Sequence, residues 1–142
     1  MKYLRPALGV LLGLYVLRNL YYFALTVGDK TGAMPLTGAN AGFKPFTDAL
    51  AWWQIAIWTV LIIAYVIATL RLFRGGKATV PLAVGFVLDA ASLIIMRGMA
   101  TYQQIVPADV QQMDIICVVA VLVGLVVVWW TERSSAPTAA AA

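Results

Sequence analysis

The sequence predicts an all-α, polytopic membrane protein with four transmembrane helices and with its N- and C-termini on the cytoplasmic side. Three observations lead to this prediction. Hydrophobic residues make up 63% of the 142 residues and charged residues 11%, whereas soluble domains average about 45–50% and about 25%. Four continuous apolar segments reach the roughly 20 residues that a helix needs to cross a bilayer. Most Lys and Arg residues fall on one side of the resulting four-span arrangement.

The four apolar segments cover residues 4–27, 51–70, 79–96 and 114–131. They are continuous runs, unlike the alternating segments of about ten residues in a membrane β-barrel, so we expect helices. Together they form a single domain over residues 1–133, and a low-complexity tail follows at residues 134–142. A cleaved signal peptide is the alternative for the first segment. Its length and its interruption by Arg18 favour a retained helix.

The connections between the segments have the composition of loops. The first, GDKTGAMPLTGANAGFKPFTD, is rich in Gly, Pro, Thr and Asn and is long enough to fold over the bundle. The second, RLFRGGKAT, is a tight connection. The third, TYQQIVPADVQQM, places Pro107 in the first turn of the last helix.

The positions of the basic residues predict the orientation. The side that holds both termini carries Lys2, Arg5, Arg71, Arg74, Lys77 and Arg133, and the other side carries Lys30, Lys44 and Arg97. Cytoplasmic loops of membrane proteins carry an excess of Lys and Arg. We therefore expect a multi-pass protein of the cell inner membrane with both termini in the cytoplasm.

Two charged residues are predicted to lie deep in the membrane, Arg18 in the first helix and Asp89 in the third. Each costs roughly 2.5–3.5 kcal/mol at the bilayer centre, so neither should face lipid alone. With a rise of about 1.5 Å per residue, their α-carbons differ in depth by about 6 Å, which an arginine side chain can cover. We therefore expect an intramembrane ion pair between Arg18 and Asp89. A second pair is expected at the outer surface, where Arg97 ends the third helix and Asp114 begins the fourth.

Two alternatives to the pairing of Asp89 stay open. Intramembrane carboxylates often mark functional sites, so Asp89 is also a candidate proton or cation site in a transport path. A relay needs a series of groups, and the predicted membrane core offers only Asp89, Ser92, Tyr15 and Tyr65. The other alternative is a partner subunit that supplies the counter-charge.

Small residues at helical spacing predict where the helices pack. Gly85, Asp89 and Ser92 follow one another at steps of four and three, so they share one face of the third helix. Small residues let membrane helices approach closely. The same reasoning predicts packing contacts at Gly9 and Gly13, which form a GxxxG pair, and at Gly124. The second helix presents Gln54, Trp58 and Tyr65 along one side, which we expect to meet a partner protein or a lipophilic ligand.

The sequence offers little for catalysis or metal binding. It contains no histidine and one cysteine, Cys117, so it lacks the ligands of a His/Cys metal site. It also lacks a histidine general base and a nucleophile motif, and we predict that the protein is not an enzyme. No cofactor is predicted, with bound lipid, quinone or pigment left as an alternative. The basic residues flank apolar segments instead of forming a patch with aromatic residues, so nucleic acid is not an expected partner.

The function predicted from these features is that of a non-catalytic accessory or assembly subunit of a larger inner-membrane complex, of a respiratory or photosynthetic kind. The reason is that the predicted packing faces outnumber those that four helices need among themselves, which indicates other membrane-protein subunits besides membrane lipids. Two alternatives stay open. One is a small ion- or proton-coupled transporter or channel that uses Asp89. The other is a binder of a lipid, quinone or carotenoid beside Trp58 and Tyr65.

Overall fold

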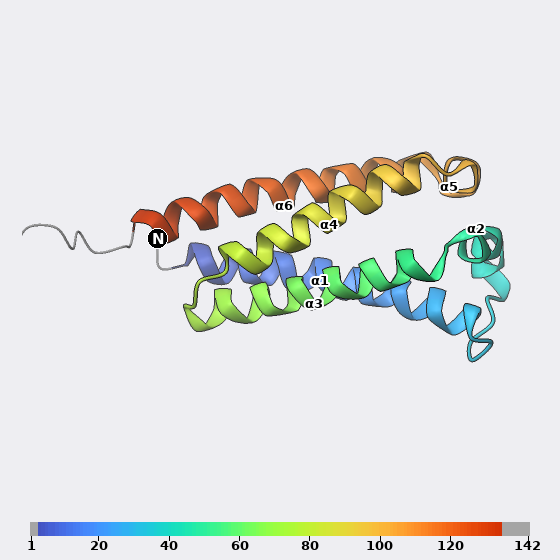
Figure 1. Ribbon diagram of the computed structural model, residues 1–142, viewed down its shortest axis with the longest axis horizontal. Coiled ribbons are helices and arrows are strands. Elements are labelled where there is room, and N and C mark those ends of the chain that lie inside the picture. The colour runs from blue at the N-terminus through green and yellow to red at the C-terminus, as the bar shows by residue number, and fades with distance from the viewer. Residues whose placement is uncertain (1–2, 135–142) are drawn as a thin grey trace, which may run out of the picture.

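Four long helices lie side by side in the computed structural model, which describes residues 3–134 (Figure 1). They are α1 (Leu4–Lys30), α3 (Trp52–Arg74), α4 (Thr79–Arg97) and α6 (Ala108–Ser134). Each is long and apolar enough to cross a membrane. Within the described residues the chain forms helices and turns without strands, which confirms the all-α, multi-pass prediction. Ser134 ends α6 instead of opening the tail, and the rest of the predicted tail and Lys2 lie outside the described residues.

The helices are longer than the apolar segments, because polar residues continue the backbone hydrogen bonding beyond the apolar run. The helix α1 ends at Lys30, α3 ends at Arg74, and α4 agrees with its predicted segment to within one residue. The helix α6 begins at Ala108, next to Pro107 as that proline predicts, and six residues before the apolar segment that opens at Asp114. Asp114 therefore lies inside α6 and does not open the helix, and Asp109 occupies the first turn in its place.

The core of the bundle runs along α3. This helix packs on both α1 and α4, and α4 also packs on α6. Four side chains of α3 are at most 2% exposed and form the centre of the core: Leu61, Tyr65, Ala68 and Leu72. Many aliphatic residues on the outward faces of the helices are exposed, as expected where a helix meets lipid.

The end of the bundle where α1 begins and α6 ends, called here the terminal end, is held together by Glu132 of α6. Its Oε1 accepts a hydrogen bond from the backbone N–H of Ala78 at 2.6 Å, and its Oε2 accepts one from the Thr79 hydroxyl at 2.7 Å. Arg5 of α1 pairs with the same carboxylate at 3.3 Å. A carboxylate is favoured there, because the N–H groups at a helix start have no partners within the helix. Glu132 therefore joins three of the four long helices.

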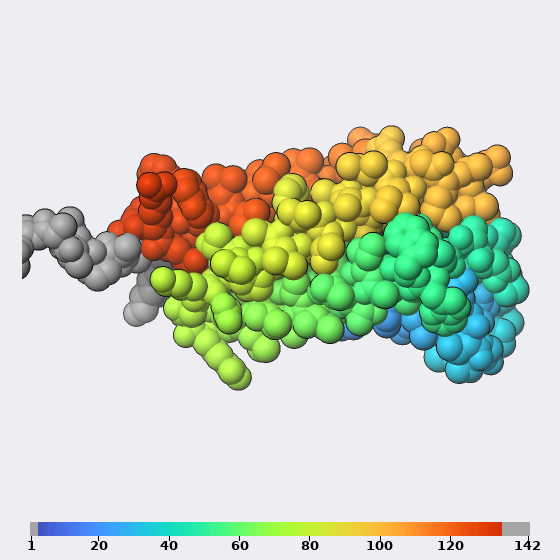
Figure 2. All heavy atoms as spheres, in the orientation of Figure 1, coloured from blue at the N-terminus to red at the C-terminus, as the bar shows by residue number. Residues whose placement is uncertain are grey.

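The opposite end of the bundle is covered by three short helices, called here the cap. They are η1 (Gly38–Phe43), α2 (Lys44–Ala49) and α5 (Ala100–Ile105). In Figures 1 and 2, α2 and α5 meet at this end, and the rings of Phe46 and Tyr102 join them with centroids 5.9 Å apart. The long first loop thus folds over the bundle as its length predicts.

Asp29, at the end of α1, holds the first loop in place. The side chain is buried, and its Oδ1 accepts a hydrogen bond from the Leu36 N–H at 3.0 Å. Its Oδ2 accepts one from the Thr47 hydroxyl at 2.8 Å and pairs with Lys44 at 3.3 Å. Hydrogen bonds to Asp48 and Asp29 raise the pKa of Lys44 above its ordinary value, so this side chain stays positively charged. The loop is therefore tied to α1 at several points.

Candidate functional site

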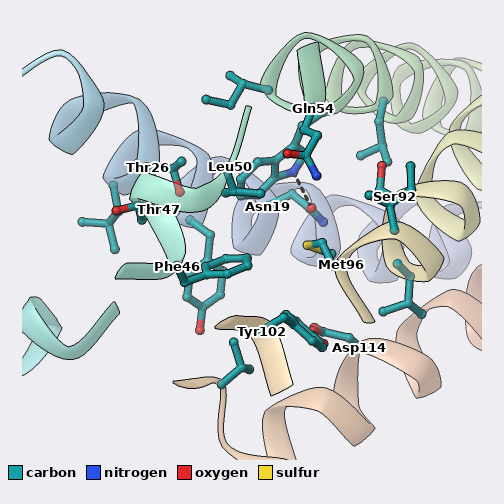
Figure 3. A pocket seen from close by; sticks show the side chains of 18 of the residues that line it. Asn19, Thr26, Phe46, Thr47, Leu50, Gln54, Ser92, Met96, Tyr102 and Asp114 are labelled. Carbon is teal, nitrogen blue, oxygen red and sulfur yellow. Dashed lines mark hydrogen bonds between the residues drawn. The ribbon is translucent and has the colours of Figure 1, made fainter. Parts of the chain in front are cut away.

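A cavity of about 170 Å³ lies between the four long helices in the half of the bundle nearer the cap (Figure 3). All four long helices and the cap contribute to its wall. Aromatic side chains form much of that wall, namely Tyr22, Phe43, Phe46, Trp53, Trp58 and Tyr102. Polar atoms come from a smaller set, which includes Arg18, Asn19, Gln54, Asp89, Ser92 and Asp114.

The carboxylate of Asp89 lines this cavity and is held by two tyrosines. Tyr15 of α1 and Tyr65 of α3 donate hydrogen bonds to the same oxygen, Oδ2, at 2.8 and 2.9 Å. Both Asp89 and Tyr65 are buried, and the two phenol rings lie 5.8 Å apart. Hydrogen bonds to an ionised acceptor are among the stronger ones in proteins. Three helices thus converge on one oxygen atom.

Gly85 makes this arrangement sterically feasible. It lies one helical turn before Asp89, and the ring of Tyr65 fills the space beside its α-carbon. A Cβ atom built on Gly85 would be 2.5 Å from Tyr65 Cδ1 and 3.1 Å from Cζ, well inside van der Waals contact. Only glycine therefore allows the ring to reach Asp89 at this position.

The predicted ion pair between Arg18 and Asp89 is wrong. The guanidinium Nη2 of Arg18 lies 2.6 Å from Asp114 Oδ1, and the Arg18 guanidinium also stacks on Tyr22, 5.5 Å from the ring centroid. Asp89 has no ion pair within residues 3–134. The depth estimate gave positions along the helix axes and no information on helix rotation. Arg18 pairs with Asp114 of α6, and the two tyrosines occupy Asp89 instead.

The predicted pair between Arg97 and Asp114 does not form either. The second oxygen of Asp114, Oδ2, accepts a hydrogen bond from the Tyr102 hydroxyl at 2.7 Å, so both carboxylate oxygens already have partners. Arg97 is exposed, and it makes no ion pair in the part of the chain that the structure describes. Burial and the bond to Asp114 raise the pKa of Tyr102 above its ordinary value, so this phenol stays a neutral donor.

The side of α3 that carries Gln54, Trp58 and Tyr65 faces the interior of the bundle, which corrects its prediction as a protein-binding face. The indole of Trp58 donates a hydrogen bond to Asn19 Oδ1 at 3.0 Å. Gln54 accepts a bond from the Ala51 N–H at 2.7 Å and lines the cavity. This face points inward because α3 lies between α1 and α4. The expectation that it meets a lipophilic ligand remains a prediction.

Of the residues predicted for helix packing, some lie in contacts between helices and others line a cavity. Cβ atoms built on Gly9 and Gly13 would lie 3.1 Å from Phe73 and 3.7 Å from Thr69, so the GxxxG face of α1 packs on α3 within the bundle. Ser92 lines the cavity. Gly124 lines a second, apolar cavity of about 230 Å³ nearer the terminal end. Tyr15 lines both cavities and thus lies between them.

Several residues of the site were not found from the sequence. Tyr102 lies in a segment that the sequence indicates as a loop, and α5 brings it against Asp114. Asn19 follows Arg18 directly, and a second polar residue inside an apolar run is a signal that could have identified it. Two structural acids outside the cavity wall, Asp29 and Glu132, were also not singled out, because both lie near the ends of apolar segments.

The chemistry of the site consists of hydrogen bonding, charge and aromatic contact. Among the described residues, no three His, Cys, Asp or Glu side chains come together in a way that could hold a metal ion. No protein-family model matches the chain, and no curated protein or solved structure is detectably similar to it. The geometry of the cavity is therefore the main guide to function.

Proposed function

We propose that this protein binds a small lipophilic molecule in the cavity between its four long helices. The observation that supports the proposal is the composition of the cavity wall, in which aromatic and aliphatic side chains surround a few convergent polar groups. Small-molecule sites in proteins usually have this composition. Within the hypotheses that the sequence leaves open, this one corresponds to the lipid, quinone or carotenoid binder.

The size of the cavity limits what it can enclose. Pockets that enclose drug-sized molecules measure about 300–1,000 Å³, and a cavity of about 150 Å³ accepts one benzene ring. At about 170 Å³, this cavity suits a single ring or the head of an amphipathic molecule. Two lining residues, Tyr22 and Trp53, are 39% and 55% exposed, so the cavity reaches the molecular surface there. The rest of a longer ligand would extend through this opening.

The accessory-subunit hypothesis receives less support from the packing. It depends on two faces that are predicted to need outside partners, the GxxxG side of α1 and the side of α3 with Trp58 and Tyr65. Both faces are used inside the bundle. That hypothesis and the transporter hypothesis stay predictions.

Titration of the purified protein in lipid nanodiscs tests the proposed function. The probe is phenylbutanol, which is neutral and carries one ring, and the readout is the fluorescence of Trp53 and Trp58 in the cavity wall. We expect saturable binding to the wild type and its loss in Ser92→Phe, which fills the cavity. Val87→Phe adds the same side chain on an exposed face of α4 and should bind as the wild type does. Absence of saturable binding, or equal binding to both variants, would overturn the proposal.

A further inference from the structure

We propose that the ligand of this cavity carries a protonated amine that pairs with the free oxygen of Asp89, an inference that rests on the proposed function. The two tyrosine hydroxyls both donate to Oδ2 of Asp89. None of residues 3–134 donates a hydrogen bond to the other oxygen, Oδ1, and this oxygen is not fully buried. Asp89 is 8% exposed and lines the cavity, which is where a ligand would meet the open oxygen.

An open carboxylate oxygen at the end of an apolar cavity selects for a hydrogen-bond donor. A carboxylate has about four acceptor positions on its two oxygens, and buried polar groups that lack partners cost free energy. The tyrosines serve only one of the two oxygens of Asp89. A ligand that donates to Oδ1 would give both oxygens of Asp89 a hydrogen-bond partner, whereas a ligand with only acceptors would be repelled.

The charge balance of the cavity favours a cation over a neutral donor. Its charged lining residues are Arg18, Asp89 and Asp114. Arg18 and Asp114 are in direct contact at 2.6 Å and compensate each other. Asp89 has no cationic side chain within 4.0 Å among the described residues, so it contributes the uncompensated charge. A buried carboxyl group avoids an uncompensated charge by binding a proton or by pairing with a cation, and a protonated amine would provide the pair.

The walls favour an organic cation over a metal ion. Calcium takes six to eight oxygen ligands, and magnesium keeps several waters, whereas this cavity offers one open carboxylate oxygen among mostly apolar side chains. Aromatic rings attract organic cations through the negative face of the ring. Trp58, Phe46 and Tyr102 lie in the wall. The cavity therefore matches an amine attached to a ring or to another apolar group.

A matched series of probes tests the inference in lipid nanodiscs made of zwitterionic lipid, with protein-free nanodiscs as the blank. Phenylbutylamine, phenylbutanol and phenylbutyrate share one apolar body and carry a cationic, a neutral and an anionic head. We expect the wild type to bind the amine at least about tenfold more tightly than the alcohol, and the carboxylate more weakly than both. Asp89→Asn should abolish this preference. Asp109→Asn, which changes an acid in the first turn of α6, should keep it.

The outcomes separate this inference from the proposed function. Equal affinity of the wild type for amine and alcohol would overturn the assignment of an amine and leave the binding function intact. Retention of the preference in Asp89→Asn would overturn the role of this carboxylate. Absence of saturable binding for all three probes would overturn the proposed function itself. The wild-type comparison does not depend on whether the variant folds, and the unfolding midpoint of Asp89→Asn shows whether its loss is specific.

Discussion

Gly85→Ala tests whether the close approach of Tyr65 to Gly85 is needed for the contact between Tyr65 and Asp89. The substitution adds a Cβ atom 2.5 Å from Tyr65 Cδ1, where ordinary contacts are 3.4–4 Å. The ring of Tyr65 has little freedom to move, because it is fully buried, contacts Tyr15 and donates its hydroxyl proton to Asp89. Either α4 moves away from α3 or the ring leaves Asp89. Both responses disturb the contact between two helices of the core.

The size of the effect follows from these two responses. Overpacking of a close-packed core costs about 1–3 kcal/mol. Loss of a hydrogen bond to a charged group costs about 1.5–3 kcal/mol. Alanine favours a helix over glycine by about 0.8–1.0 kcal/mol, which offsets part of the loss. Either loss, less the helix gain, leaves a net cost, and we therefore expect Gly85→Ala to lower the free energy of unfolding by about 1–2 kcal/mol.

Unfolding in mixed micelles with increasing denaturing detergent, followed by tryptophan fluorescence, measures this change. Gly13→Ala is the matched control, because its Cβ would lie 3.7 Å from Thr69, an ordinary contact. It should leave the stability unchanged or raise it slightly. Tyr65→Val removes every ring atom near Gly85, so Gly85→Ala should cost little in that background. If Gly85→Ala were as stable as Gly13→Ala, the steric argument would be refuted.

Three further predictions concern contacts outside this cluster. Asp29→Ala removes the anchor of the first loop, so limited proteolysis should cut that loop faster than in the wild type. Asp48→Asn changes an exposed side chain and should leave the cleavage rate unchanged. Equal cleavage rates for the two variants would contradict the anchoring role of Asp29. Glu132→Ala leaves N–H groups at the start of α4 without partners and should lower the free energy of unfolding by about 1–3 kcal/mol; an unchanged detergent midpoint would speak against it. The double variant Arg18→Gln/Asp114→Asn should lose less free energy of unfolding than the sum of the losses in the two single variants. Additive losses in this double-mutant cycle would argue against direct contact between the two side chains.

The transmembrane helices are predictable from the sequence because the length of an apolar run is a local property. Their ends are less so, since a helix continues through polar residues that a hydropathy criterion excludes. The start of α6 shows this, because the helix begins next to Pro107, as that proline predicts, whereas the apolar run begins only at Asp114. The predicted partner of Asp114 was wrong because Arg18 and Tyr102 hold its two oxygens.

Some members of the candidate site were predictable from the sequence, but their contacts were not. Four polar residues stand out in the apolar segments. Three of them, Tyr15, Arg18 and Asp89, line the cavity, and the fourth, Tyr65, donates a hydrogen bond to Asp89. Their partners could not be derived, because sequence spacing gives depth and face but not the rotation of one helix relative to another. Tyr102 was missed because its position depends on a short helix in a connecting segment.

The sequence by itself determined that four apolar helices are present and that Arg18 and Asp89 need partners inside them, because composition and helical periodicity are properties of the chain alone. Only the tertiary structure decided which partners these are. Tyr65 reaches Asp89 because Gly85 leaves room for its ring, and Arg18 reaches Asp114 because α1 and α6 bring the two side chains to 2.6 Å. Both contacts depend on how the helices rotate and pack against each other, and that packing leaves one oxygen of Asp89 without a donor among residues 3–134.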